Sequence, residues 1–129
     1  QVETLVDTLN LNLMAPYLLM REYKRKVNKG LIVNILDERV ARTVPTFAAY
    51  SVSKVALQHL TELAAVEWGE TVRVNGIAPG LILPPEGAPP DYMEKGNVRS
   101  QGTLDDLLKA LGYLMENKHV NGETLFVTH

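Results

Sequence analysis

L-I-V-N-I-L, residues 31–36, is a short apolar run that is rich in β-branched side chains and interrupted only by Asn34. This profile is typical of a strand buried on both faces, and we expect it to be a central strand of a parallel sheet. A long helix is predicted to follow over residues 48–69. Its apolar surface is broad enough to contact both the sheet and another helix, and it contains Val52, Val55, Ala56, Leu60, Leu63, Ala64 and Val66.

The segment before this strand predicts one helix over residues 1–27. Apolar residues recur there at a spacing of four, as expected for the buried stripe of an amphipathic helix. We expect Pro16 to bend this helix and residues 28–30 to end it. The stripe consists of Leu5, Leu9, Leu13 and Tyr17.

The C-terminal half continues the alternation of strands and helices. A second strand is predicted at 72–77, and a last strand at 124–127 follows an Asn-Gly turn. Between them, the proline- and glycine-rich stretch 79–102 predicts an irregular loop that covers a substrate. Thr103 and Asp106 form a capping pair that predicts the start of a third helix.

The predicted order of elements indicates one α/β domain over residues 1–129. Strands that alternate with helices form parallel sheets with helical crossovers. Only three strands are predicted, however, and a sheet this narrow leaves an unpaired edge. We therefore expect the chain to be part of a larger doubly wound fold, with a preceding half absent from this sequence.

Composition excludes several classes of function. The formal charge of -2 provides no field that would attract nucleic acid or an anionic membrane surface. There is no cysteine, no apolar stretch of membrane-spanning length and no leader pattern, so we expect a cytoplasmic protein that acts on a small molecule. The three histidines, His59, His119 and His129, lack the spacing of metal ligands, and no metal is predicted.

Tyr50 and Lys54 lie four residues apart at the start of the long predicted helix and therefore share one face. A lysine ammonium in this position stabilises a phenolate. It should lower the pKa of the tyrosine from about 10 and make it a usable acid near neutral pH. The spacing alone is weak evidence, because most such pairs combine packing with a solvated charge.

Five motifs in a fixed order give this pair its context. They are N-x-x-x-P-Y from Asn12, I-V-N-I at 32–35, Y-S-V-S-K at 50–54, R-V-N-x-I-x-P-G at 73–80 and N-G-E-T-L at 121–125. Together they resemble the short-chain dehydrogenase/reductase family, and the resemblance covers nearly the whole chain. It implies the C-terminal, catalytic part of a Rossmann-like doubly wound parallel sheet, without the N-terminal nucleotide-binding half.

The resemblance also implies roles for individual residues. Tyr50 would donate the proton, and Lys54 would hold the nicotinamide ribose. Asn12 would join them through a water-linked relay, although its structural alternative is a local hydrogen bond within the helix. The turn after the second strand would lie beside the nicotinamide of NADPH or NADH, through Pro79, Gly80, Leu81 and Ile82. In the family, the first and long helices pack against their symmetry mates, which implies a homodimer or homotetramer.

Asp37 departs from the family pattern, in which a serine usually lies 13 residues before the tyrosine and donates to a substrate carbonyl. An ionised carboxylate has no proton to donate. It accepts N–H bonds instead, or helps to protonate a ring nitrogen if burial raises its pKa. The aspartate resembles the pteridine reductase and dihydromonapterin reductase branch, which reduces pterin C=N bonds, and implies that Asp37, Tyr50 and Leu81 contact the substrate. A degenerate site or a different substrate is the alternative.

Three functional hypotheses follow. The first is an NADPH-dependent reductase of a pterin-like C=N bond, and the second is a reductase of another carbonyl, such as an oxoacyl group. The third is a catalytically silent module that pairs with a complete reductase, because no glycine-rich loop opens a strand-to-helix turn in this chain to hold a pyrophosphate.

Overall fold

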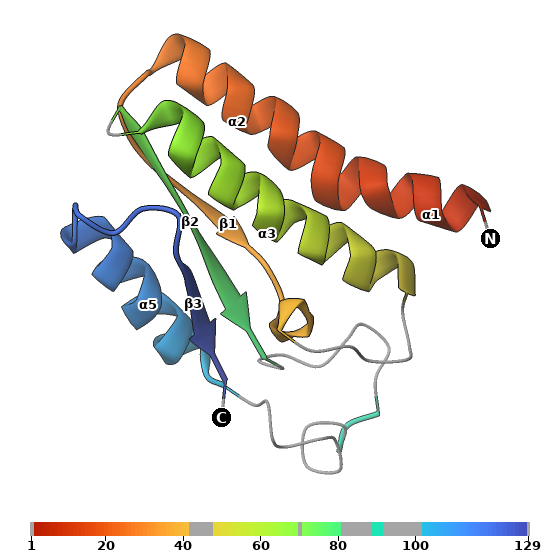
Figure 1. The fold of residues 1–129 in the computed structure, drawn as a ribbon. Helices are drawn as coiled ribbons and strands as arrows, with labels where there is room; N and C mark the ends of the chain where they lie inside the picture. Colours follow the sequence, from red (N-terminus) through yellow and green to blue (C-terminus); the bar gives the residue numbers. More distant parts are fainter. Residues whose placement is uncertain (1, 42–47, 70, 81–88, 92–101, 129) are drawn as a thin grey trace.

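The computed structural model describes residues 2–41, 48–69, 71–80, 89–91 and 102–128, and has a parallel sheet between two layers of helices (Figure 1). The elements in chain order are α1 (Val2–Leu9), the π-helical η1 (Asn10–Met14), α2 (Ala15–Lys26), β1 (Gly30–Ile35), the 3-10 helix η2 (Glu38–Val40), α3 (Ala48–Trp68), β2 (Val72–Pro79), α5 (Leu104–Glu116) and β3 (Thr124–Val127). The predicted α/β fold with parallel strands is therefore confirmed.

The strand order within the described residues is β1-β2-β3. β1 pairs with β2 from Gly30↔Val72 to Ile35↔Ile77, and β2 pairs with β3 over its carboxyl half. Within this partial sheet β2 is the middle strand, and β1, the strand predicted at residues 31–36, forms one edge. The unpaired edge expected of a sheet with three strands therefore lies along β1, where Ile35 is 47% exposed.

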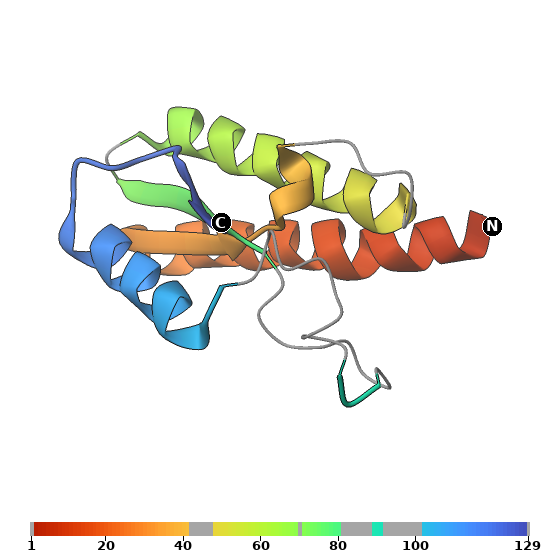
Figure 2. The same cartoon turned by 90° about the horizontal axis from the view of Figure 1, so that it is seen from below.

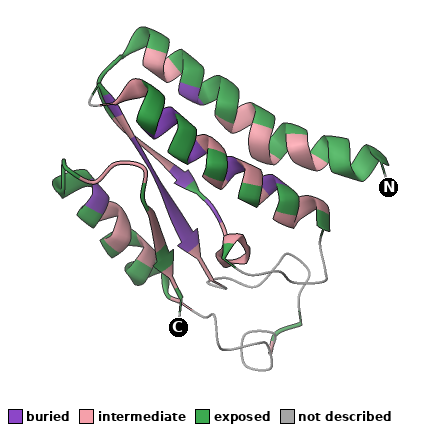
Figure 3. Cartoon of the chain, in the orientation of Figure 1, coloured by how far each residue is buried: buried purple, intermediate pink, exposed green. Residues whose placement is uncertain are grey.

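Helices cover both faces of β2 (Figure 2). On one face, α2 and α3 pack against the sheet through a buried cluster, and on the other face lies α5 with its fully buried Leu114. Burial is accordingly concentrated on β2 (Figure 3). The cluster consists of Met20, Ala64, Ala65, Val72 and Val74. These two layers hold the carboxyl ends of the strands in fixed positions.

The first helical region differs from the prediction of one helix bent at Pro16. α1 and α2 run on into one another through the π-helical turn η1, in which the N–H of Ala15 bonds to the carbonyl of Asn10 five residues earlier. Pro16 lies in the first turn of α2. A proline is tolerated there because its missing N–H and its fixed φ disturb a first turn least. Widening of the helix over η1 takes the place of the expected bend.

A side chain after α5 fastens the C-terminal end of α3 to the sheet. The amide nitrogen of Asn121 donates to the carbonyls of Ala65 (3.1 Å) and Gly69 (3.3 Å), and its oxygen accepts the N–H of the buried Val74 (2.9 Å). The last carbonyls of a helix need such partners. Asn121 therefore satisfies groups of two elements at once.

We expect Asn121→Ala to lower the free energy of unfolding by about 2–3 kcal/mol, because it leaves the buried N–H of Val74 without its acceptor and removes a donor from the carbonyls of Ala65 and Gly69. Chemical denaturation measures this loss. Asn117→Ala is the matched control, since Asn117 makes one exposed side-chain bond, to Tyr113 O at 2.7 Å, and should cost less than about 1 kcal/mol. Equal losses in the two variants would contradict the assigned role.

Candidate active site

Asp37 lies just beyond the carboxyl end of β1, where it begins the 3-10 helix η2. Its backbone is extended, and its carboxylate Oδ1 accepts the N–H of Arg39 at 2.9 Å. Aspartate is among the residues that favour this position, because its side chain satisfies an otherwise unpaired N–H of the first turn. The cap fixes the direction of the carboxylate at the edge of the sheet.

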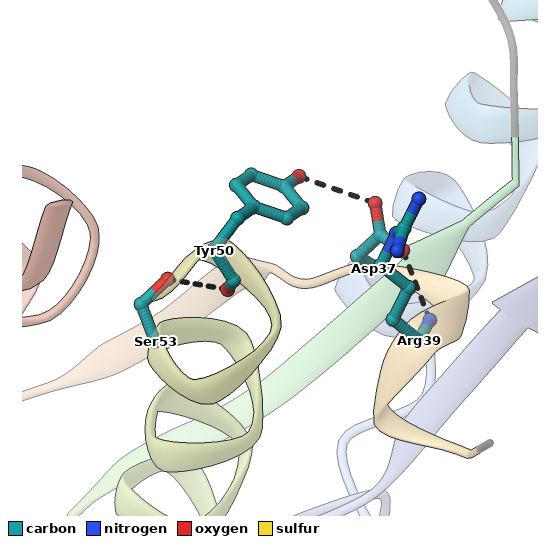
Figure 4. A network of polar contacts seen from close by, with 4 residues as sticks. All are labelled: Asp37, Arg39, Tyr50 and Ser53. Carbon is teal, nitrogen blue, oxygen red and sulfur yellow. Dashed lines mark hydrogen bonds and ion pairs between the residues drawn. The ribbon is translucent and has the colours of Figure 1, made fainter. Parts of the chain in front are cut away.

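Tyr50 and Lys54 come from the first turns of α3 and reach the same place. The Tyr50 hydroxyl donates to Asp37 Oδ2 at 3.1 Å (Figure 4). Lys54 Nζ donates to the carbonyl of Ile35, the last residue of β1, at 2.9 Å, and lies 5.6 Å from the centre of the Tyr50 ring. The structure thus brings together the phenol, the amine and the carboxylate that the sequence analysis singled out.

The electrostatics of this cluster differ from the prediction. Burial and the neighbouring Asp37 carboxylate, by its charge and its hydrogen bond, raise the pKa of Tyr50 to about 12. Burial also lowers the pKa of Lys54, an effect that Asp37 opposes. The expectation that Lys54 lowers the pKa of Tyr50 is wrong for this structure, because the partner of the hydroxyl is an anion and the ammonium donates to the backbone of β1.

Asn12 approaches this cluster from η1. Its amide nitrogen donates to Ser53 Oγ at 3.2 Å, and Ser53 Oγ donates to the Tyr50 carbonyl at 2.6 Å (Figure 4). Asn12 is therefore connected to the turn of α3 that carries Tyr50.

The predicted cofactor residues fall on the turn that follows β2. Pro79 ends β2, and the N–H of Gly80 donates to the Val127 carbonyl on β3 at 3.1 Å. This fixes the turn at the carboxyl edge of the sheet, the same edge at which Asp37 lies. Leu81 and Ile82 lie outside the described residues, as does most of the predicted substrate loop 79–102.

All 129 residues of the chain match the family described as enoyl-(acyl carrier protein) reductase. The chain belongs to the short-chain dehydrogenase/reductase family. Members of this family are NAD(P)-dependent oxidoreductases. The resemblance drawn from the five ordered motifs is confirmed by this match.

Relatives within the short-chain reductases include enzymes named for pterins. Pteridine reductase 1 of Leishmania tarentolae is 32% identical over 103 residues, which are 69% of this chain and 36% of that protein. Dihydromonapterin reductase of an Enterobacter species is 29% identical over 134 residues, covering 97% of this chain and 56% of that protein. The matched residues thus cover 36% and 56% of the length of these two curated relatives.

A solved short-chain reductase has the same fold. The FolM alternative dihydrofolate reductase 1 of Brucella canis, whose structure is complexed with NADP, aligns with a TM-score of 0.88 at 27% identity. The alignment covers 99% of this chain and 54% of the Brucella chain. The described fold is thus shared with about half of a nucleotide-binding reductase.

Two residues that lie beside Asp37, Tyr50 and Lys54 were not among those predicted from the sequence. Ser53 is fully buried between Asn12 and Tyr50, and its place inside Y-S-V-S-K could have indicated a contact. Arg39 lies beside Asp37, and the Asp-x-Arg spacing of a capped turn was the available signal.

Among the described residues no group of three or more potential ligands could hold a metal ion. None of the helices described here is both long and apolar enough to cross a bilayer.

Proposed function

We propose that residues 1–129 form the catalytic part of an NADPH-dependent reductase that reduces a C=N bond of a pterin-like substrate. The observation that carries this proposal is the hydrogen bond from the Tyr50 hydroxyl to Asp37 Oδ2 at 3.1 Å. It couples a phenolic proton to a carboxylate where most members of the family are expected to have serine. The relatives named for pteridine and dihydromonapterin support the same substrate class.

The protonation state of Tyr50 favours the reductive direction. With a pKa raised to about 12 by burial and by Asp37, the phenol keeps its proton throughout the neutral range. A protonated phenol serves as a general acid, whereas oxidation of an alcohol or amine needs a base at this position. Tyr50 is therefore suited to deliver a proton to the nitrogen of a C=N bond.

Asp37 provides hydrogen-bond acceptors for the N–H groups of a nitrogen heterocycle. An ionised carboxylate offers about four acceptor positions, and two of them take the Arg39 N–H and the Tyr50 hydroxyl. The remaining positions accept ring or exocyclic N–H groups, which a carbonyl substrate lacks. Asp37 would thus orient the pterin, and Tyr50 would protonate it.

The residues at this edge also fit a nicotinamide cofactor. Lys54 brings an ammonium and Tyr50 a hydroxyl, which are suitable donors for ribose oxygens, and the turn at Pro79 and Gly80 lies along the same carboxyl edge. NADPH supplies a hydride when bound. Leu81 and Ile82 would extend the contact beyond Gly80. The NADP in the Brucella structure favours NADPH over NADH.

A second candidate is a reductase that acts on an acyl group. The description of the matching family, enoyl-(acyl carrier protein) reductase, is the observation that favours it. In that case Asp37 would not hydrogen-bond the substrate carbonyl, and Tyr50 alone would provide the proton. A silent module is the third candidate.

Exposed apolar side chains on the outer helices support an assembly of several copies. Leu11, Leu19, Val52 and Val66 are each more than half exposed on η1, α2 and α3. Apolar side chains exposed on neighbouring helices are the kind of surface that a subunit interface buries. We propose a homodimer or homotetramer built on these helices, in the cytoplasm, where the absence of cysteine in this chain carries no cost.

Titration of the purified full-length protein with NADPH, followed by nicotinamide fluorescence, tests the proposed function. We expect saturable binding and then oxidation of the cofactor on addition of dihydromonapterin, with a lower rate for an oxoacyl thioester. Oxidation only with the thioester would favour the acyl candidate. Folded protein that binds no NADPH would favour the silent module.

A further inference from the structure

Arg39 folds back over Asp37 on the side opposite to Tyr50. Its backbone N–H donates to Asp37 Oδ1 at 2.9 Å, and its Nε lies 3.8 Å from the same oxygen. Both side chains are largely enclosed, with 22% and 23% of their surface exposed. Figure 4 shows the carboxylate between the Tyr50 hydroxyl and the Arg39 guanidinium.

This arrangement gives the two carboxylate oxygens different partners. Oδ2 receives the phenolic proton, and Oδ1 faces a cation. A carboxylate beside a phenol opposes ionisation of the phenol, and a cation on its far side weakens that effect. Ionisation of Tyr50 therefore depends on two opposite charges, those of Asp37 and Arg39, which lie on the same short turn.

The charged groups around Tyr50 among the described residues come from η2 and α3. Asp37 opens η2, which also carries Glu38 and Arg39, and Lys54 lies one turn further along α3. Asn12 and Ser53, which approach from the other side, are uncharged. Asp37 and Arg39 are the charges that act on the pKa of Tyr50, the first raising it and the second lowering it.

We infer that Arg39 is a positioning residue for the proton donor: its guanidinium offsets the charge of Asp37 and keeps the proton of Tyr50 transferable. The backbone cap from Arg39 to Asp37 does not depend on the side chain, so a substitution removes the charge and keeps the turn. The last step, transfer to a substrate, rests on the proposed function. The effect on ionisation of the phenol does not.

The direct test is an NMR titration of tyrosine labelled with carbon-13 at Cζ, with the Tyr50 signal assigned by its loss in Tyr50→Phe. We expect Arg39→Gln to lower the ionisation constant of Tyr50 about three- to tenfold, as for removal of one nearby charge, and Arg39→Lys to restore most of it. Because the wild-type pKa is about 12, the same pair of variants is also compared in an Asp37→Asn background, where titration begins at lower pH.

Arg25→Gln is the matched control, since Arg25 is 67% exposed on α2 and pairs with Glu22. It should leave the Tyr50 titration unchanged. An unchanged titration in Arg39→Gln, or equal displacement in the control, would overturn the inference.

Kinetics provide an independent readout once turnover has been established. Arg39→Gln should lower kcat about three- to tenfold with little change in KM, because a weaker acid transfers its proton more slowly. The alkaline limb of its pH–rate profile should move to higher pH. Arg39→Lys should restore both kcat and the position of this limb. A displaced titration in a protein that reduces no substrate would refute the proposed function and leave the charge effect standing. Normal turnover with an unchanged titration would refute the inference alone.

Discussion

Replacing Tyr50 by phenylalanine is expected to reduce the rate of substrate reduction about 10²–10⁴-fold, the usual contribution of a general acid. The substitution removes the hydroxyl that donates to Asp37 at 3.1 Å and keeps the ring. Binding of NADPH should change far less than turnover, because the ammonium of Lys54 and the turn at Gly80 remain. Steady-state rates and an NADPH titration on the same preparation separate the two effects.

The matched control for this substitution is Tyr113→Phe. Tyr113 lies on α5 with 48% of its surface exposed, so the same loss of one hydroxyl should leave turnover unchanged. Both variants should retain the far-ultraviolet circular dichroism of the wild type. A Tyr50→Phe protein with at least a tenth of the wild-type rate would show that the phenol is not the proton donor.

Asp37→Ser is the second substitution with a large expected effect. It replaces an acceptor by the hydroxyl that the family resemblance associates with carbonyl substrates. We expect reduction of a dihydropterin to fall about 10²-fold, because buried N–H groups of the substrate lose their acceptor, while reduction of a small ketone is retained or rises. The ratio of kcat/KM for the two substrates measures this change in specificity.

Asp37→Asn is the control for charge at this position. It keeps the size of the side chain and one acceptor oxygen but removes the anion that raises the pKa of Tyr50. The pKa of the phenol should therefore fall below about 12, and the alkaline limb of the rate profile should move to lower pH, since Tyr50 must be protonated to act as an acid. An equal loss on both substrates in Asp37→Ser would mean that Asp37 supports the fold and does not select the substrate.

Short-range patterns allowed most of the fold to be predicted. β3 has the predicted bounds at Thr124–Val127, and the capping box of Thr103 and Asp106 begins α5 as expected. These features depend on neighbouring residues, so the sequence is sufficient to identify them. Short-range patterns do not determine the strand order, because the neighbours of a strand are set by distant parts of the chain.

The same reasoning explains which parts of the site could be predicted. Tyr50 and Lys54 share a helix face by spacing alone, and both do reach the edge of β1. The pKa of Tyr50 could not be predicted, because it depends on burial and on a carboxylate 13 residues earlier in the chain. Arg39 was missed for a related reason: the Asp-x-Arg spacing indicates a capped turn, but it does not show that the arginine side chain folds back over the carboxylate.

The cluster of phenol, carboxylate and amine is proposed to reduce a C=N bond. To test this, the protein is incubated with a dihydropterin and with NADPH that carries deuterium at both positions of nicotinamide C4. The mass of the product is then measured by mass spectrometry. We predict one deuterium on a ring carbon of the product, formed far more slowly by Tyr50→Phe. Folded protein that binds the cofactor and transfers no deuterium to the pterin would contradict the proposed reduction.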